Sequence, residues 1–156
     1  ISRAEMEIGS DGSGKLISYL RKNGKKFSAD EKLIISDGSP GIGCSVISSI
    51  TGCDAVLVVT EPTKSGLEDL MRVVALCEHF GVFTMVCINK FDINEEMSSK
   101  IEEFIKSKEL ELVGKIPYDD MVMKSINELK PIIYYEESKA ATAIKEMWEK
   151  VKNRIY

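Results

Sequence analysis

The sequence predicts an α/β fold in which a mostly parallel sheet carries helices on both faces. Short runs such as Ala55–Val59 and Phe83–Ile88 are apolar at nearly every position, which is typical of strands buried on both sides. These runs alternate with amphipathic segments of helical period, and that order favours parallel strands joined by crossover helices. With 156 residues, 44% of them hydrophobic, the chain is long enough to bury one core. We therefore expect residues 1–156 to form a single α/β domain.

The elements expected in the first part of the chain are short. We predict a strand at Ala4–Ile8 and a helix at Lys15–Lys26, whose leucines and isoleucine fall on one side. Leu33–Ile35 is predicted as the first core strand and Ala55–Val59 as the second. Unpaired backbone groups inside a sheet are costly, so these two core strands need a partner: each other, the segment Ala4–Ile8, or another chain. We expect direct pairing or recruitment within one chain.

The elements expected in the rest of the chain alternate regularly between helix and strand. The helical spacing of apolar residues, and Gly81 in the position of a C-terminal cap, predict a helix at Ser65–Phe80. A third core strand follows, and then a helix, a fourth strand and two further helices. In order, these elements are Phe83–Ile88, Glu95–Ser107, Leu110–Ile116, Asp119–Leu129 and Ser138–Val151.

Composition excludes several classes of protein. The net charge is −4, whereas a nucleic-acid surface needs a basic footprint, so we expect no nucleic-acid partner. No apolar run reaches the roughly 18 residues of a membrane span, and the first residues lack the apolar segment of a signal peptide. The four cysteines have no zinc or iron–sulfur spacing and are expected to be buried, reduced thiols. We expect a cytoplasmic protein.

An acidic turn follows the first predicted core strand. In open α/β sheets the ligand lies beyond the carboxyl ends of the strands, and Asp37 stands at that point. An acid at the tip of an apolar strand is the Walker B arrangement, which holds Mg²⁺ beside the phosphates of a nucleotide, often through water. The glycines that follow would let backbone N–H groups approach a phosphate. A turn that merely ends a strand explains the same residues equally well.

The segment Asn89-Lys90-Phe91-Asp92 follows the third predicted strand. This N-K-x-D pattern occurs in nucleotide-binding proteins, where the Asn amide offers both a donor and an acceptor to a base edge. Asn and Asp also favour ordinary turns, so the position after a buried strand gives the pattern its weight. A second pattern, Gly9 to Lys15, fits G-x-x-x-x-G-K, but Leu16 replaces the Ser or Thr that Mg²⁺ requires. We interpret Ser13 there as a helix N-cap.

Several stretches of the chain, in the same order, resemble the C-terminal part of the MinD/ParA/Mrp-type P-loop ATPases. The resemblance is strongest to those MinD-superfamily ATPases that carry an inserted ferredoxin domain. Ser39 and Ser45 stand where the family pattern usually has Pro. The matching stretches are Ser13–Ile17, Ile34–Val46, Val59–Leu70, Ile88–Asn94, Gly114–Asp119 and Ile144–Glu149.

The resemblance implies a role for particular residues of this sequence. Asp37 would be the Walker B acid, catalytic and holding Mg²⁺ through water. Gly38 and Gly41 would form the switch loop that senses the γ-phosphate. The adenine base would be contacted and walled by Asn89, Asp92, Ile116, Pro117 and Tyr118.

The resemblance also implies a function for the intact protein: an ATP-binding ATPase that uses ATP, ADP and Mg²⁺ as a nucleotide-dependent switch, in iron–sulfur or redox-related processes. A homodimer would be its working form. The family's K-G-G-x-G-K phosphate loop and the cysteine run of the ferredoxin domain are absent from this sequence, and the chain begins with Ile1. We expect both to lie upstream, which leaves an incomplete P-loop NTPase-like fold.

Phosphoryl transfer is mainly positioning and charge stabilisation. We therefore expect this chain alone to be inactive and to bind none of these ligands tightly. The alternative is a non-catalytic α/β binding or scaffold module that has lost the phosphate loop.

Overall fold

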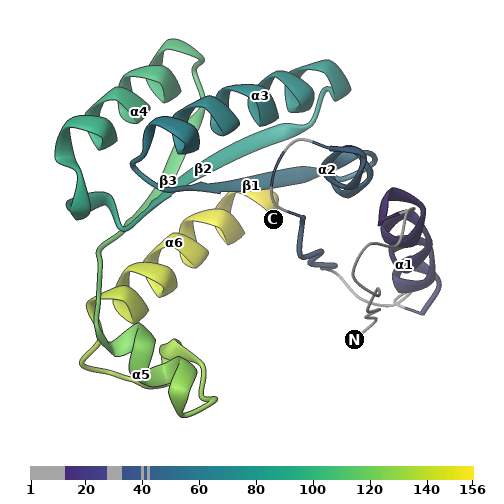
Figure 1. The fold of residues 1–156 in the computed structure, drawn as a ribbon. Coiled ribbons are helices and arrows are strands. Elements are labelled where there is room, and N and C mark those ends of the chain that lie inside the picture. The colour runs from purple at the N-terminus through teal and green to yellow at the C-terminus, as the bar shows by residue number, and fades with distance from the viewer. Residues whose placement is uncertain (1–12, 28–32, 40, 42) are drawn as a thin grey trace.

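The computed structural model describes residues 13–27, 33–39, 41 and 43–156, and its sheet lies between two layers of helices (Figure 1). The helices are α1 (Ser13–Phe27), α2 (Cys44–Ile50), α3 (Lys64–Phe80), α4 (Glu95–Ser107), α5 (Met121–Asn127) and α6 (Lys139–Ile155). Short 3-10 turns form η1 (Phe91–Ile93) and η2 (Ile132–Tyr134). The strands are β1 (Ala55–Thr60), β2 (Phe83–Asn89) and β3 (Glu111–Ile116).

The strands lie in the order β1-β2-β3, and both strand pairs are parallel. The register aligns Ala55 with Phe83 and Thr60 with Ile88, so β1 and β2 end side by side. β2 is the central strand, and every residue from Thr84 to Ile88 is buried. Burial on both faces explains why this segment of the sequence is almost continuously apolar.

Helices cover both faces of the sheet. α3 and α4 lie on one face and α6 lies on the other (Figure 1). The two crossovers step across the sheet in the same direction, and since parallel crossovers are almost always right-handed, both crossover helices fall on one side. On that side Leu70 of α3 and Ile101 of α4 pack in a buried cluster with Ile88, while Val151 of α6 packs against Met85 on the other. The predicted fold class is therefore confirmed.

Most predicted elements are confirmed, with small shifts at their ends. α4 has the predicted bounds, and Gly81 ends α3 with a positive φ of 63°. The helix expected at Asp119–Leu129 is shorter, because α5 covers Met121–Asn127. Within the described residues, none of the helices has the length and apolar character needed to cross a membrane.

The predicted core strand at Leu33–Ile35 is wrong. Residues 33–39 have no regular secondary structure, and Ile34 and Ile35 are 47% and 72% exposed. Consequently they do not pair with β1, whose partner among the described strands is β2. With no ladder partner among the described strands, this three-residue run does not form a strand. The other segment considered for pairing, Ala4–Ile8, lies outside the described residues.

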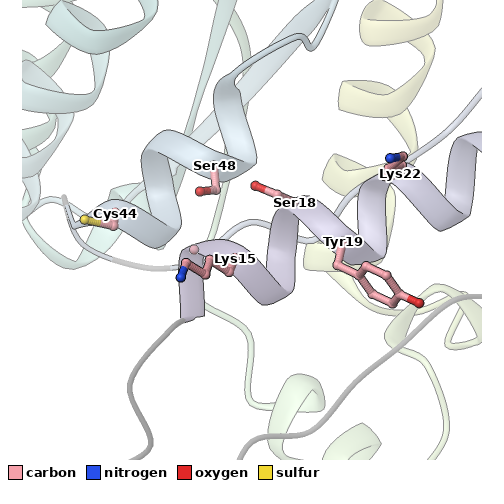
Figure 2. Close-up of a pocket in the computed structure, with 7 residues that line it drawn as sticks. Lys15, Ser18, Tyr19, Lys22, Cys44 and Ser48 are labelled. Atoms are coloured by element: carbon pink, nitrogen blue, oxygen red, sulfur yellow. The ribbon is translucent and has the colours of Figure 1, made fainter.

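α2 was not expected from the sequence, and Arg21 of α1 ties it down. The Arg21 guanidinium donates from Nη1 to the backbone oxygens of Ser48, at 2.7 Å, and Thr51, at 2.5 Å. These carbonyls belong to the last turn of α2 and to its C-cap, Thr51, where backbone oxygens lack helical partners and a cation is favoured. A hollow of about 520 Å³ lies between the two helices; Figure 2 shows Lys15, Ser18, Tyr19, Lys22, Cys44 and Ser48 along it. Lys15 is in the first turn of α1, and Ser13, interpreted from the sequence as an N-cap, is already the first residue of that helix.

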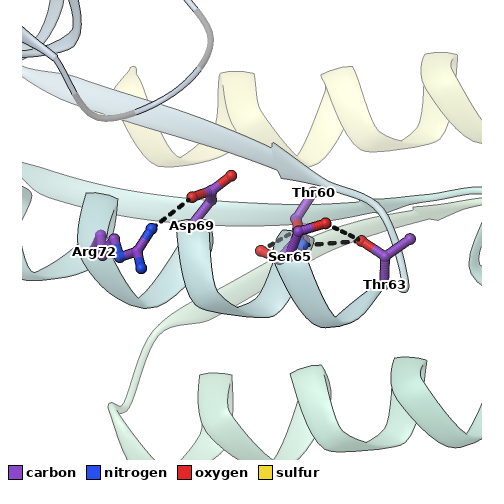
Figure 3. A network of polar contacts seen from close by, with 6 residues as sticks. Thr60, Thr63, Ser65, Asp69 and Arg72 are labelled. Atoms are coloured by element: carbon purple, nitrogen blue, oxygen red, sulfur yellow. Dashed lines mark hydrogen bonds and ion pairs between the residues drawn. The ribbon is translucent and has the colours of Figure 1, made fainter.

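The start of α3 is held by a network around Thr60 (Figure 3). The buried Thr60 hydroxyl donates to the backbone oxygen of Gly66 at 2.9 Å, and the backbone N–H of Gly66 donates to the Thr63 hydroxyl at 2.9 Å. Gly66 lies so close to Glu61 that an added Cβ would collide with the Glu61 carbonyl oxygen. This loop fixes the backbone that leaves the carboxyl end of β1.

A second close approach joins β3 to α6. A Cβ added to Gly114 would lie 2.8 Å from Cβ and 2.9 Å from Cγ of Met147, and 3.4 Å from the sulfur of Cys87. The absence of a side chain at Gly114 therefore lets α6 sit directly on the sheet. Met147 also belongs to the buried clusters that hold α6 in place.

Asp119 links the loop after β3 to the start of α6. Its Oδ2 accepts hydrogen bonds from the Ser138 hydroxyl at 2.7 Å and from the Ala140 backbone N–H at 3.1 Å, and its Oδ1 accepts from the Met121 backbone N–H at 2.9 Å. Ser138 is the N-cap of α6 and accepts from Ala141. These bonds, above all that from Ser138, hold the pKa of Asp119 below its usual value.

The four cysteines are free thiols in different surroundings. Cys77 and Cys87 are buried, as expected from their apolar segments, and burial raises the pKa of Cys87 to about 11. Cys53 is half-buried and Cys44 is exposed at the start of α2, so the expectation of four buried thiols is wrong for this pair. Cys44 is the first residue of α2, and Cys53 lies in the turn between α2 and β1.

Replacing Gly66 with Ala is expected to destabilise the fold by about 1–3 kcal/mol, because the new Cβ must push against a backbone carbonyl rather than a flexible side chain. The matched control is Gly24→Ala in α1, where no atom lies within 4 Å of the added Cβ and helix propensity favours Ala. Urea unfolding of both variants measures the difference. Equal midpoints for the two variants would contradict this account of the loop.

The Asp119→Ala variant is expected to lose about 1–2 kcal/mol of stability at pH 7, since a helix cap and its hydrogen bonds are removed. The lowered pKa of Asp119 stabilises the fold above the unfolded value of about 4, and this stability is lost as the pH falls below it. The variant should therefore show a weaker loss of stability in acid than the parent chain. Asp54→Ala, an exposed carboxylate just before β1, is the control. If the parent and the Asp119 variant lose stability equally as the pH falls, the Asp119 carboxylate does not stabilise the start of α6.

Candidate functional site

The carboxyl ends of the three strands form one edge of the sheet. Glu61 follows β1, Lys90 follows β2 and Pro117 follows β3. The register also places Asn89, the last residue of β2, beside Ile116, the last residue of β3. Since parallel strands point the same way, residues that are far apart in sequence come together at this edge, where α/β sheets bind ligands.

Glu61, Asn89 and Lys90 form a polar cluster at the ends of β1 and β2. Oε1 of Glu61 accepts a hydrogen bond from Asn89 Nδ2 at 3.4 Å. The same oxygen forms an ion pair with Lys90 Nζ at 2.8 Å. Lys90 has a φ of 53°, a left-handed conformation that turns the chain from β2 into η1. The hydrogen bond and charge of Glu61 raise the pKa of Lys90 above its usual value. Sequence reasoning passed over Glu61, although the acid stands directly at the carboxyl end of a core strand.

Asp92 is joined to the loop that follows β3. Its Oδ1 accepts a hydrogen bond from the backbone N–H of Tyr118 at 2.7 Å, across 26 residues of sequence. The turn that carries Asp92 is fixed by the buried Ser98 hydroxyl, which donates to the Phe91 backbone oxygen at 2.6 Å. One oxygen of the Asp92 carboxylate is thus used to position Tyr118.

The segment Ile116–Tyr118 forms an apolar wall beside this edge. Ile116 is buried and packs with Cys87 and α6, Pro117 is half-buried, and Tyr118 is 50% exposed. A shallow hollow of about 310 Å³ adjoins Pro117. The first turns of α6 and the two residues before them complete its lining, with Glu137, Ser138, Lys139, Thr142, Ala143 and Glu146.

Asp37, Gly38 and Gly41 lie in a separate segment. Asp37 is exposed, and no hydrogen bond or ion pair joins it to another residue in the described part of the chain. Gly38 lies beside α2, where an added Cβ would be 3.8 Å from Cβ of Ser49, and Gly41 has a φ of 87° that favours glycine. The structure therefore brings together Asn89, Asp92 and the wall, whereas no hydrogen bond or ion pair among the described residues joins them to the segment of Asp37.

The described residues assemble no metal site by themselves. No group of three His, Cys, Asp or Glu side chains is placed to hold a metal ion within the described ranges. Mg²⁺ is usually held by one or two carboxylates together with waters and the phosphates of a substrate. A lone exposed Asp37 matches one carboxylate of such a set and no more, so we derive no step through a metal ion.

Comparison with protein-family models finds no match, whereas curated proteins give clear sequence relatives. The chain is 34% identical over 151 residues to an uncharacterised protein of Methanocaldococcus jannaschii, covering 97% of this chain and 50% of that protein. It is 33% identical over 128 residues to an ATP-binding protein of the same organism, with coverage of 79% and 48%. An iron–sulfur cluster carrier protein of Pyrococcus horikoshii is 28% identical over 155 residues, with coverage of 90% and 51%. The chain thus spans about half the length of these relatives.

Solved structures give the same fold. The MinD cell division protein of Aquifex aeolicus matches with a TM-score of 0.72 and 23% identity, over 90% of this chain and 61% of that one. The cell division ATPase MinD of Pyrococcus furiosus matches with a TM-score of 0.74 and 21% identity, over 90% and 59%. At such identities the likeness establishes the fold alone. The chain therefore has the fold of the MinD proteins, and its sequence relatives include proteins named ATP-binding proteins and iron–sulfur cluster carrier proteins.

Proposed function

We propose that this chain provides the base-binding half of an ATP site within a longer MinD/ParA-type ATPase. The observation that carries the proposal is the meeting of Asn89, Asp92 and the Ile116–Tyr118 wall at the carboxyl edge of a parallel sheet. The relatives support it, because one is named an ATP-binding protein and the MinD of Pyrococcus horikoshii was solved as a complex with Mg-ADP. That structure matches this chain with a TM-score of 0.70 and 22% sequence identity.

The chemistry of the wall and of Asn89 suits a purine base. Pro117 and the half-exposed ring of Tyr118 offer flat apolar surface on which a base can pack. The Asn89 amide offers hydrogen-bonding groups to the edge of the base. In this proposal Asp92 acts mainly by holding the Tyr118 backbone, which refines the direct contact with adenine that the resemblance implies.

Asp37, Gly38 and Gly41 belong to the phosphate half of the proposed site. When bound, Mg²⁺ would neutralise charge on the phosphates, and Asp37 would hold its water shell. The proposal assigns Gly38 and Gly41 to the loop that approaches the terminal phosphate. These residues need a phosphate-binding loop from the longer protein to complete the site.

The wider role proposed for the longer protein is that of a nucleotide-dependent switch in an iron–sulfur or redox-related process. The support is the group of relatives named iron–sulfur cluster carrier proteins. A homodimer, and an upstream part that carries the phosphate loop and a ferredoxin domain, belong to the same proposal. A scaffold without nucleotide is the competing function, and base binding separates the two.

The Asn89→Ala variant is expected to weaken AMP binding about fivefold to tenfold, since one hydrogen bond at a partly solvated edge is lost. Asn153→Ala, an exposed Asn near the end of α6, is the matched control and should leave the affinity unchanged. Titration of AMP followed by NMR chemical shifts measures both variants. Identical curves for the two variants would contradict the assigned base edge, and no binding by the parent chain would favour the scaffold.

The 156-residue chain is expected to show no steady hydrolysis of ATP, because the lysine and hydroxyl of a phosphate loop are absent from its sequence. Phosphate release over hours, compared with a blank without protein, measures this. Release that persists through purification and disappears in Asp37→Asn would show that the chain holds a complete catalytic site.

A further inference from the structure

The orientation of the Asn89 amide is fixed by Glu61. Glu61 Oε1 accepts a hydrogen bond from Asn89 Nδ2 at 3.4 Å and forms an ion pair with Lys90 Nζ at 2.8 Å. An ionised carboxylate accepts hydrogen bonds and has none to give, so it is the NH₂ end of the amide that must face it. The carbonyl oxygen Oδ1 of Asn89 then points away from Glu61. The side of the amide that faces away from Glu61 therefore presents the acceptor Oδ1, while Nδ2 keeps its second N–H.

The backbone that carries Glu61 is held on a rigid support. The neighbouring Thr60 is 6% exposed, and its hydroxyl is bonded to the Gly66 backbone. Gly66 packs directly against the Glu61 carbonyl oxygen. By contrast, the side chains of Glu61 and Lys90 are 48% and 40% exposed, and an ion pair so open to water contributes little to stability. Glu61 is therefore better suited to orienting the Asn89 side chain than to stabilising the fold.

We propose that Glu61 is a positioning residue that makes this site select 6-amino purines over 6-oxo purines. The inference rests on the base site proposed above. Adenine carries an NH₂ donor at position 6, whereas guanine and hypoxanthine carry a carbonyl acceptor there. An Asn89 that presents Oδ1 pairs with the amino group, and it meets the carbonyl of a 6-oxo purine with lone pair against lone pair.

The engagement of Asp92 acts in the same direction. A 6-oxo purine carries an N–H donor at position 1, and a free carboxylate would be a strong partner for it. In this structure Asp92 Oδ1 already accepts the Tyr118 backbone N–H at 2.7 Å. One of the two carboxylate oxygens that could accept the N–H of a 6-oxo purine is thus already engaged within the protein.

The test compares AMP with IMP, which differ at position 6 of the base and in the proton at position 1. The 156-residue chain is titrated with each nucleotide as the parent, as Glu61→Gln and as Glu68→Gln. The parent is expected to prefer AMP by about tenfold. AMP gains one hydrogen bond to Asn89 Oδ1, whereas the carbonyl of IMP is repelled by the same oxygen. In Glu61→Gln the new amide can donate, so Asn89 is free to turn over, and the preference should fall toward about onefold, chiefly through tighter IMP binding.

The control and a second variant make the result specific. Glu68 is exposed on α3 and forms no hydrogen bond or ion pair with the described residues, so Glu68→Gln should keep the preference of the parent. Glu61→Ala removes the acceptor without adding a donor and should also lose the preference. An unchanged AMP-to-IMP ratio in both Glu61 variants, or an equal loss of affinity for both nucleotides, overturns the role of Glu61 while leaving the base site in place. A parent chain that binds neither nucleotide overturns the proposed function itself.

Discussion

Parallel pairing of β1, β2 and β3 is the constraint on which the rest of this structure depends. It makes the three strands end at one edge, and it sets β2 between layers of helices so that residues from Thr84 to Ile88 are all buried. The polar residues Glu61 and Asn89 meet because the register of β1 and β2 aligns Thr60 with Ile88. Without that register, the acid that follows β1 and the amide at the end of β2 would not be close enough to share a hydrogen bond.

Two places without a side chain let the helices approach this sheet closely. At Gly114 the backbone of β3 touches Met147, so α6 can seal the face opposite α3 and α4. At Gly66 the first turn of α3 folds back on the Glu61 carbonyl. The same loop that starts a helix therefore also fixes the support of the candidate site. Packing and site geometry are not separable in this part of the molecule.

The sequence predicted the elements whose stability is local, and it failed where distant residues decide. Continuous apolar runs identified β1 and β2, because burial on both faces leaves that pattern. Leu33–Ile35 shows a similar pattern but has no ladder partner among the described strands, and apolar character alone does not make a strand. α2 was missed because its serine-rich segment is held by Arg21, 27 residues before Ser48. The Asn89 and Asp92 positions were predictable from their motif, whereas their partners Glu61 and Tyr118 are 28 and 26 residues away.

Because the cysteines differ in burial, their rates of chemical labelling report on opening of the fold. A thiolate, not a thiol, reacts with alkylating reagents, and a pKa of about 11 keeps Cys87 protonated at neutral pH in addition to shielding it. Cys87 sits against Gly114 at the centre of the sheet, so it becomes reactive when the contact between β3 and α6 opens. Cys44 is exposed in this structure and sets the rate of an unprotected thiol. The ratio of the two labelling rates thus measures the free energy of opening the sheet, without any probe being added to the protein.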